Sequence, residues 1–362
     1  MSDEDQKTRL VCFKPFQWFE LGWDKQAYSC CSGWVTKSIG RMPEQSALEI
    51  WNSEAARAMR ESVLDGSFRY CKKEYCPHLQ EVSSPVVHKS EEFIREFRRF
   101  VNEPELPKRL NCSYDVSCNL SCPSCRTEIK QSTRPEREAN DRLFASMLEE
   151  LGEGLEIINI TGSGDPFASR HFWHILTNGG LAKYPNIRIR LHTNGQLLDP
   201  KHWEKLASIR EQICDIEISF DGASKEVFEV NRHPANWEKQ LANFKFISEA
   251  RKRGEFKLLQ TNFVVQANNW HEMKDFIKLC LDHHVDHVRF MSLNNWGTFT
   301  DDQYRAMAVH RPEHPQHAAL LEMLRDPIFR LPQVGIGISD SIDGFVDGLG
   351  QASSSPNYQT EV

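Results

Sequence analysis

Three cysteines in the middle of the chain lie close enough in sequence to share one metal centre. They are Cys118, Cys122 and Cys125 in the segment DVSCNLSCPSCR, a C-x-x-x-C-x-x-C array. Three thiolates can hold a 4Fe–4S cluster in which one iron lacks a protein ligand. An open coordination position marks catalytic rather than structural metal sites. The array therefore predicts a reactive iron–sulfur centre, with a structural zinc site or three unrelated buried thiols as the alternatives.

Five more cysteines lie near the start of the chain, which has 11 in all. They are Cys12, Cys30, Cys31, Cys71 and Cys76. An odd count, a chain of 362 residues and the polar opening MSDEDQKTRL do not fit a secreted, disulfide-stapled protein. In a reducing compartment, clustered cysteines serve metal or redox chemistry more often than disulfides. We therefore expect a cytoplasmic protein with two metal-binding regions.

The composition excludes several other classes of protein. Hydrophobic residues make up 40% and charged residues 26% of the chain, which is ordinary globular usage. The formal net charge of -7 disfavours a protein whose main ligand is the nucleic-acid backbone. The longest apolar runs are a few residues, far below the ~18 needed to span a bilayer. We expect a globular protein that binds neither nucleic acid nor a membrane.

From residue 110 onward, apolar strand-like segments alternate with helical ones. Such a repeat predicts right-handed βαβ units and a parallel sheet. Six strands are too few for a closed eight-stranded barrel, so we expect an α/β fold built as a partial (β/α)6 barrel. The three-cysteine array follows the first strand, at the end where βα barrels carry their active sites. The expected strands are 110–116, 155–161, 187–193, 213–220, 257–266 and 287–294, and the expected helices are 137–151, 169–178, 202–211, 236–253 and 270–284.

The part before this repeat predicts a separate, small, cysteine-rich α+β module. Its clearest helix carries an apolar stripe at steps of three and four residues and stops at Gly66. The stripe consists of Leu48, Trp51, Ala55, Met59 and Val63. We expect four segments, namely the module at 1–88, a linker with a short charged helix at 89–108, the partial barrel at 109–300, and a C-terminal helix and irregular tail at 301–362.

In this setting the cysteine array resembles the signature of the radical S-adenosylmethionine (radical SAM) superfamily, although Ser124 stands where the family usually has an aromatic residue. The turn TGSGDPF resembles the segment that receives the cofactor's amino group, and LHTNG resembles the ribose-side segment. The segment ISFDGASKEVFEVNR resembles one whose arginine often contacts the cofactor carboxylate. An ordinary glycine-rich turn and a surface arginine are the alternatives. The resemblance implies that the cofactor is bound by Ser163, Gly164, Asp165, Pro166, Thr193, Asn194, Ser219, Asp221 and Arg232.

The resemblance also implies a mechanism. S-adenosylmethionine would chelate the open iron, and one electron from the reduced cluster would cleave its sulfonium bond. The resulting 5′-deoxyadenosyl radical would take hydrogen from an unactivated C–H bond, while the protein orients the reactants. An electron donor such as flavodoxin or ferredoxin is an implied partner.

Residues 12–79 resemble a SPASM or twitch-type module that binds an auxiliary cluster. Such modules usually follow the barrel, whereas this one precedes it. The resemblance assigns a second 4Fe–4S cluster to four cysteines, and Cys30 rather than Cys31 keeps the family spacing after Asp24. A zinc knuckle is the alternative, because four cysteines also suit zinc. The assigned ligands are Cys12, Cys30, Cys71 and Cys76.

Strand alternation predicts which side chains face the barrel interior. On the fourth strand the face with Cys214, Ile216, Ile218 and Phe220 should pack on helices, and the polar face should line the lumen. A polar lumen suits a polar or charged substrate, and a buried ion network without a ligand is the alternative. The expected lumen residues are Arg190, His192, Glu217, Gln260, Asn262 and Arg289.

We expect a radical SAM oxidoreductase whose auxiliary cluster assists a dehydrogenation or a bond formation. Because the first 88 residues leave no room for a leader-peptide-binding domain, a small metabolite of amino-acid, sugar or aminocyclitol type is favoured. A maturase of a ribosomally made peptide is the first alternative. An epimerase would need a thiol hydrogen donor, for which Cys31 and Cys112 are candidates, since Cys214 and Cys280 fit the core. A non-catalytic iron–sulfur or zinc protein is the remaining alternative.

Overall fold

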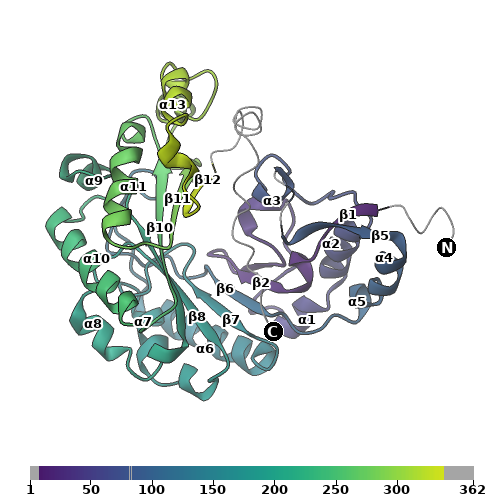
Figure 1. Cartoon of the computed structure of the whole chain (residues 1–362). Coiled ribbons are helices and arrows are strands. Elements are labelled where there is room, and N and C mark those ends of the chain that lie inside the picture. Colours follow the sequence, from purple (N-terminus) through teal and green to yellow (C-terminus); the bar gives the residue numbers. More distant parts are fainter. Residues whose placement is uncertain (1–7, 81, 83, 338–362) are drawn as a thin grey trace. The chain divides into compact units, whose positions relative to one another are not determined.

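The computed structural model describes residues 8–80, 82 and 84–337, and their elements fall into two compact units (Figure 1). Within the described residues, the first unit comprises 8–116, 132–164 and 170–189. The second comprises 117–131, 165–169 and 190–337. None of the helices in the described ranges is long and apolar enough to cross a membrane.

The first unit contains two sheets. In one, β1 (Thr8–Cys12) pairs antiparallel with β5 (Val86–Ser90). In the other, the strand order is β7-β6-β2-β3-β4. Strand β2 pairs parallel with β6 and antiparallel with β3, so strands of the cysteine-rich module extend the parallel sheet. The bounds are β2 (Trp18–Leu21), β3 (Gln26–Tyr28), β4 (Gly40–Arg41), β6 (Arg109–Cys112) and β7 (Ile157–Ile160).

The helix expected over the apolar stripe is two helices, α1 (Ala47–Trp51) and α2 (Glu54–Leu64). Ser46 and Ser53 cap them by accepting hydrogen bonds from backbone N–H groups of the first turn. Trp51 is fully buried, but Leu48 is 40% exposed, so its place in the stripe was wrong. The other helical segments of this unit are η1 (Lys14–Phe16), η2 (Ser32–Trp34), α3 (Pro77–Gln80), α4 (Glu91–Phe97), α5 (Arg99–Asn102), α6 (Arg134–Leu151), α7 (Arg170–Thr177) and η3 (Leu181–Lys183).

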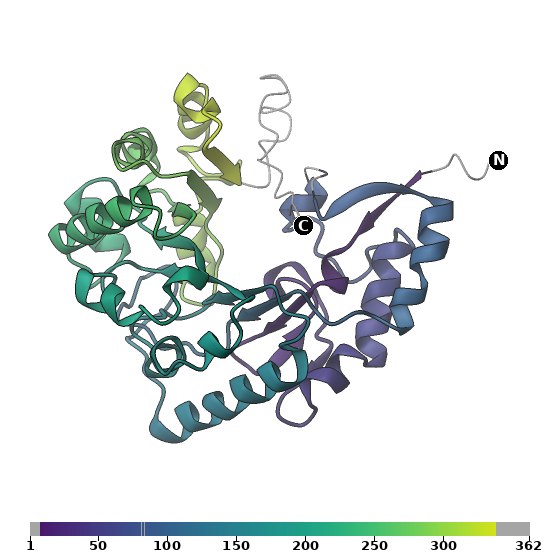
Figure 2. The same cartoon turned by 60° about the horizontal axis from the view of Figure 1, so that its bottom comes forward.

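The segment 89–108, expected to be a linker, is folded into the module. Helices α2, α4 and α5 lie side by side next to the β1–β5 pair (Figure 2). Ile94 and Val101, from α4 and α5, are buried in one hydrophobic cluster with residues of β1 and α2. The boundary expected at residue 88 therefore falls inside β5, and the module's core needs the residues that follow it. The cluster consists of Val11, Phe16, Val63, Leu64, Phe68, Ile94 and Val101.

The second unit is a parallel α/β layer. Strand β8 (Arg188–Thr193) starts in the first unit, and its last four residues belong to the second. The strand order in this unit is β8-β9-β10-β11-β12. Strand β10 pairs in parallel with β9 and with β11, and β11 pairs in parallel with β12. The other strands are β9 (Ile213–Ser219), β10 (Leu258–Val265), β11 (His287–Ser292) and β12 (Val334–Gly337). The helical segments are α8 (Pro200–Lys205), η4 (Arg210–Gln212), α9 (Lys225–Asn231), α10 (Trp237–Lys252), η5 (Trp270–Glu272), α11 (Met273–Asp282), α12 (Asp301–Met307), α13 (His317–Met323) and η6 (Pro327–Arg330).

All six expected strands of the repeat form, as β6 to β11. A further strand, β12, was not expected, because the tail from about residue 330 reads as irregular. It pairs parallel with β11, so the described strands from residue 109 onward are β6 to β12, one more than the six expected. The rest of that tail, from residue 338, lies outside the described residues.

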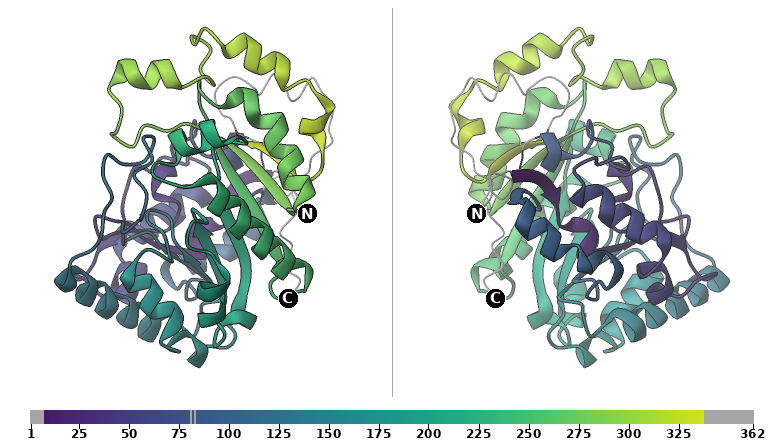
Figure 3. Two further views of the ribbon diagram at one scale, coloured as in Figure 1. Left: turned by 90° about the vertical axis from the view of Figure 1, so that its left-hand side faces the viewer. Right: turned by 90° about the vertical axis from the view of Figure 1, so that its right-hand side faces the viewer.

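The expected apolar face of β9 packs on helices. Helices α10 and α11 lie along one face of the strands (Figure 3). The ring of Phe220, just after β9, meets Phe228 of α9, Phe244 of α10 and Phe276 of α11 at centroid distances of 6.0, 4.8 and 5.3 Å. Cys280 is fully buried in this layer and bonds to Thr261, so it belongs to the core as expected. The polar face of β9 is thereby left to build the site.

Candidate functional site

The three-cysteine array lies on the loop 117–131 of the second unit. Cys118 and Cys122 are buried, whereas Cys125 is exposed. Two backbone hydrogen bonds anchor the loop, from Cys118 N to Lys130 O at 2.9 Å and from Ser121 N to His233 O at 2.7 Å. A tight turn, with Cys125 N bonded to Cys122 O at 2.9 Å, brings the last two cysteines together.

Each of the three sulfurs has its own hydrogen-bond donor. Cys118 Sγ accepts from Leu120 N at 3.4 Å and from Asn194 Nδ2 at 3.6 Å. Arg232 Nη1 donates to Cys122 Sγ at 4.0 Å, and Arg126 Nη2 donates to Cys125 Sγ at 3.5 Å. Donors of this kind stabilise thiolates and adjust the potential of an iron–sulfur cluster. Two of the donors are cations, so the site is built for sulfur atoms that carry negative charge.

The ionisation of these cysteines fits a metal ligand rather than a free thiolate. Burial raises the pKa of Cys118 to about 11 and also raises that of Cys122. Such thiols lose their proton when a metal cation takes its place. Among the described residues, no three His, Cys, Asp or Glu side chains are gathered closely enough to hold one metal ion. A cluster avoids this requirement, because each thiolate binds a different iron.

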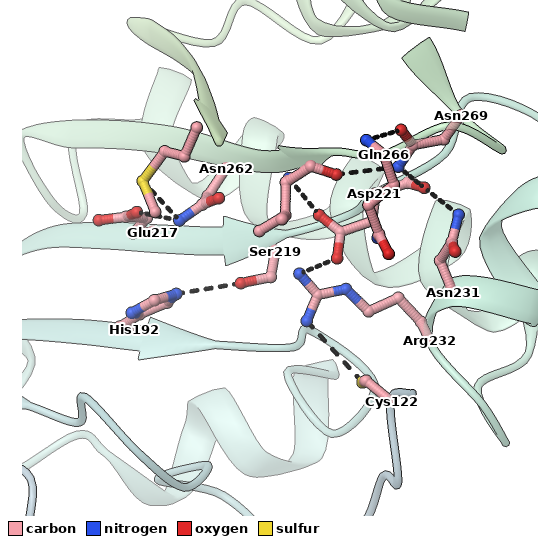
Figure 4. Close-up of polar contacts among 12 residues, drawn as sticks. Cys122, His192, Glu217, Ser219, Asp221, Asn231, Arg232, Asn262, Gln266 and Asn269 are labelled. Carbon is pink, nitrogen blue, oxygen red and sulfur yellow. Dashed lines mark hydrogen bonds and ion pairs between the residues drawn. The ribbon is translucent and has the colours of Figure 1, made fainter. Parts of the chain in front are cut away.

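Arg232 forms a buried ion pair beside the cysteine loop (Figure 4). Its Nη2 lies 2.8 Å from Asp221 Oδ2, and the two side chains are 14% and 1% exposed. Asp221 Oδ1 accepts from Val264 N at 2.6 Å, and its carbonyl accepts from Asn231 and Asn269. The expected alternative of a surface arginine is therefore wrong. Within the described part of the chain, Arg232 Nε is buried and has no partner, which leaves one donor for an anionic ligand.

The Asp165 carboxylate is fully hydrogen-bonded within the protein. It is 1% exposed, and its Oδ2 accepts from Thr193 Oγ1 at 2.7 Å and from Asn194 N at 2.8 Å. Its Oδ1 accepts from the N–H groups of Phe167 and Ala168 at 3.0 and 3.1 Å. Four donors occupy both oxygens, so this side chain ties the turn after β7 to the end of β8.

The remaining residues expected to bind cofactor also make contacts within their units. In the first unit, Ser163 donates to Ser113 O at 2.5 Å, and Gly164 N donates to Thr161 Oγ1 at 3.2 Å. In the second unit, the Asn194 side chain donates to Asn119 Oδ1 at 2.9 Å as well as to Cys118. Pro166 is buried. These contacts give the expected cofactor turns a fixed shape.

The polar face of the second unit divides into two parts. Asp215 Oδ2 is paired with Arg190 at 2.5 Å and accepts from Gln260 at 2.6 Å, while its buried Oδ1 has no hydrogen-bond partner among the described residues. Glu217 accepts from Asn262 at 3.0 Å, and its Oε2 lies 3.6 Å from Arg289 Nη1.

The second part, around Glu217, leaves groups that a substrate could use. Burial raises the pKa of Glu217, but His192 and Arg289 outweigh it and hold the pKa at about 2. His192 bonds to Ser219 Oγ at 3.0 Å (Figure 4). Among the described residues, the buried Asn262 Oδ1 has no partner.

Four early cysteines surround one cavity in the first unit. Cys12, Cys30, Cys71 and Cys76 line it, whereas Cys31 is not among its lining residues. Burial raises the pKa of Cys12 to about 12 and that of Cys71 to about 11. Lys14 also lines the cavity, and its Nζ lies over the rings of Trp18 and Trp34 at 4.3 and 4.5 Å. Four desolvated thiols around one cavity, with a cation beside them, fit an iron–sulfur cluster.

Comparison with known families decides the identity of both regions. The radical SAM superfamily model matches residues 116–280, and the model of SPASM, an iron–sulfur cluster-binding domain, matches residues 12–78. The chain is a radical SAM protein with an N-terminal SPASM domain. The expected fold class is confirmed, including the position of the module before the barrel. The radical SAM domain implies a 4Fe–4S cluster and S-adenosylmethionine, and the SPASM domain implies auxiliary cluster binding.

Similar curated proteins have different functions. An AdoMet-dependent heme synthase of Nitratidesulfovibrio vulgaris is 30% identical over 45% of this chain and 42% of its own length. The mycofactocin maturase MftC of Mycolicibacterium smegmatis is 24% identical over 51% of this chain and 44% of its own. This radical SAM chain therefore spans less than half the length of either relative.

Solved structures with a similar arrangement include Streptococcus suis SuiB bound to the precursor peptide SuiA. It is 13% identical with a TM-score of 0.48, covering 82% of this chain and 64% of that one. Native anSMEcpe with bound AdoMet is 18% identical with a TM-score of 0.42, covering 67% of this chain and 66% of that one.

Sequence reasoning missed the donors to the sulfurs of Cys118, Cys122 and Cys125. Arg126 directly follows the third cysteine, so its position was a usable signal. Asn194 was expected at the ribose, yet its amide reaches Cys118. Of the two candidate hydrogen donors, Cys112 is fully buried and hydrogen-bonded to Tyr114, which places it in the core. Cys31 is half-buried.

Replacing Arg126 by glutamine should make the radical SAM cluster harder to reduce. Glutamine can still donate to Cys125 but lacks the positive charge that favours the more negative, reduced cluster. We expect the midpoint potential to fall by roughly 30–60 mV, in line with about 1 kcal/mol for a half-exposed charge. An anaerobic redox titration followed by electron paramagnetic resonance measures this shift. Arg126→Lys keeps the charge and should lie closer to the unaltered protein, and an unchanged potential in Arg126→Gln would contradict the prediction.

Proposed function

We propose that this protein uses S-adenosylmethionine to generate a 5′-deoxyadenosyl radical and abstracts hydrogen from a polar substrate. The observation that carries the proposal is the three-cysteine loop with a donor at every sulfur and the unpartnered Arg232 Nε beside it. The proposed ligands of the catalytic cluster are Cys118, Cys122 and Cys125. When bound, cluster and cofactor together supply the electron transfer and the radical.

The residues around the loop have positioning roles in this proposal. Asp221 holds Arg232 through Nη2 and so fixes the direction of Nε, which would donate to the carboxylate of the cofactor. Asp165 keeps the turn after β7 and the end of β8 together. Arg126 and Asn194 orient Cys125 and Cys118 through their sulfurs. Thr193, Ser219, Ser163, Gly164 and Pro166 remain proposed cofactor contacts.

The cavity in the first unit is the proposed site of an auxiliary 4Fe–4S cluster, with Cys12, Cys30, Cys71 and Cys76 as ligands. Its proposed task is to complete an oxidation. Loss of a hydrogen atom leaves the substrate as a carbon radical, which must still release one electron and one proton to form a double bond. We propose the auxiliary cluster as the one-electron acceptor that takes that electron, so the substrate is dehydrogenated overall. An oxidative bond formation has the same overall stoichiometry, because it too removes two electrons and two protons from the substrate.

A peptide is the substrate that we propose in place of the small metabolite expected from the sequence. That expectation relied on the lack of room for a leader-binding domain in the first 88 residues. One of the curated relatives is named a maturase, although another is named a heme synthase. Asn262 Oδ1, which has no hydrogen-bond partner among the described residues, suits a peptide N–H group. The partly exposed guanidinium of Arg289 suits a peptide C=O group.

Anaerobic reconstitution tests the radical function directly. The loaded protein should contain about eight iron atoms per chain, and Cys76→Ala about four. With dithionite and S-adenosylmethionine, it should release 5′-deoxyadenosine. If the protein holds the catalytic cluster but releases no 5′-deoxyadenosine, the radical proposal is wrong. If the unaltered protein contains only about four iron atoms per chain, the proposal of an auxiliary cluster is wrong.

Deuterated candidate peptides then test the substrate class. Transfer of deuterium into deoxyadenosine, with loss of two mass units from an undeuterated peptide, supports dehydrogenation. Deuterium taken up by the product from D2O without any oxidation would instead favour an epimerase. Transfer from a sugar or an amino acid, and from no peptide, would restore the small-metabolite alternative.

A further inference from the structure

A short antiparallel contact brings two basic segments of the SPASM domain together. Val35 forms a β-bridge with Cys71, and Thr36 N donates to Tyr70 O at 2.9 Å. Lys72 N donates in return to Trp34 O at 2.8 Å. The bridge therefore places Lys37 beside the basic segment RYCKK, at residues 69–73.

These basic groups surround a solvent-open hollow, which we call the basic hollow. Lys37 and Lys72 line it, and all but one of the other lining residues are polar. The exception is Val35, which is 4% exposed and also lines the cavity of the four cysteines. The basic hollow and the proposed cluster cavity thus share one lining residue, Val35. The hollow is lined by Gln26, Tyr28, Ser32, Val35, Thr36, Lys37, Ser38 and Lys72.

Lysines at the hollow stand out in a chain whose net charge is -7, although two lining residues, Gln26 and Ser32, donate to the carboxylates of Asp24 and Glu20. Arg69 is neutralised by Asp65, which lies 2.6 Å from its Nη1. Lys37, Lys72 and Lys73 have no carboxylate partner within 4 Å among the residues that the structure describes. The Nζ of Lys37 lies 5.0 Å from the centre of the Tyr70 ring.

Lys72, which lines the hollow, directly follows Cys71 of the cavity and begins the segment that leads to Cys76. Tyr75 N and Cys76 N both donate to Lys72 O, at 3.0 and 3.1 Å, so residues 72–76 form a compact turn. Tyr75 is 49% exposed on that turn and supplies an apolar contact at its surface. Small, charge-complementary contacts of this kind are typical of transient electron-transfer complexes.

We propose that the basic hollow, with Lys73 and Tyr75, is the docking site of an acidic one-electron carrier protein that exchanges electrons with the auxiliary cluster. This rests on the proposed function, because it needs a cluster in the four-cysteine cavity. In each exchange the carrier loses one electron and the auxiliary cluster gains one, or the reverse. No bond is made or broken, and no proton is required. An acidic carrier is favoured because its charge complements Lys37, Lys72 and Lys73, which have no carboxylate partner among the described residues.

Charge reversal at the hollow tests this proposal. Reduced plant-type ferredoxin serves as the acidic probe and is mixed anaerobically with the oxidised, cluster-loaded full chain without S-adenosylmethionine. The double variant Lys37→Glu, Lys72→Glu should oxidise ferredoxin at least about tenfold more slowly at low salt. The difference should shrink as ionic strength rises, because salt screens the attraction. Dithionite, which needs no docking, should reduce both proteins at the same rate.

A matched variant separates docking from a change in net charge. Lys239→Glu with Lys245→Glu alters two exposed lysines of α10 by the same amount and should leave the ferredoxin rate unchanged. Equal rates for the hollow variant and the unaltered protein would overturn the proposal, as would equal slowing in the α10 variant. A fast phase that survives Cys76→Ala would also overturn it. Dithionite-driven deoxyadenosine formation reports separately on the proposed function.

Discussion

Replacing Cys122 by alanine should abolish 5′-deoxyadenosine formation, with a fall of at least about 10³-fold. Cys122 is buried, receives a hydrogen bond from Arg232, and is the middle thiol of the proposed ligand set. Two thiolates cannot complete a three-ligand site, because one more iron would then lack a protein ligand. Alanine would also leave Arg232 without its sulfur acceptor. Deoxyadenosine measured after anaerobic reconstitution with dithionite gives the fall directly.

Two further cysteine variants show whether the loss is specific. Cys214→Ala removes a half-buried thiol on β9 and should keep nearly full cleavage. Cys76→Ala removes a proposed auxiliary ligand, so it should spare cleavage far more than product formation. Iron analysis of the Cys122 variant should show only the loss of the catalytic cluster. Undiminished deoxyadenosine from Cys122→Ala would mean that this loop does not hold the reactive cluster.

The strands of the repeat could be predicted because their signal is local. Each of β6 to β11 carries buried apolar residues, in several strands at alternate positions, and is followed along the chain by a helix, and neither feature depends on distant segments. Strand β5 is different, because Val86–Ser90 is a strand only through its pairing with Thr8–Cys12. Strand β12 is the short sequence VGIG, which is extended because β11 offers an edge. The break between α1 and α2 had a local signal, because Ser53 is a typical capping residue. The continuous apolar stripe instead led to the prediction of one helix.

The cysteines of the site could also be found from the sequence, since their spacing is short. The donors to their sulfurs could not, with the exception of Arg126. Asn194 reaches Cys118 from the end of β8, and Arg232 reaches Cys122 from the end of α9. Asp165 looked like a shortened cofactor ligand, but two of its four donors come from residues 193–194, up to 29 residues away in the sequence. Contacts of this kind form only in the folded sheet, so neither the amino-acid composition nor the hydrophobic periodicity of the sequence predicts them.

Replacing Asp221 by alanine should destabilise the protein by about 3–5 kcal/mol and also suppress cleavage of S-adenosylmethionine. Removing one partner of a buried ion pair leaves the other charge without compensation. Asp221 Oδ1 also accepts from Val264 N, so a buried backbone donor would lose its partner. The residue has a φ of 63°, a left-handed conformation that aspartate and asparagine tolerate better than alanine. Alanine therefore loses the charge, the acceptor and the backbone preference together.

Asparagine at the same position separates these causes. Asp221→Asn keeps the acceptor and the backbone preference but not the charge, so it should cost less stability than alanine while still impairing cleavage, because Arg232 loses its ionic anchor. Arg232→Met should be destabilising as well, since Asp221 then stays buried and unpaired. Combined with Asp221→Asn, it should cost less than the sum of the two single changes, which is the signature of a direct interaction. Urea unfolding of the full chain followed by tryptophan fluorescence measures all three. If the two changes add without coupling, the pair does not act as a unit, and the orientation of Arg232 Nε must depend on its other contact, the sulfur of Cys122.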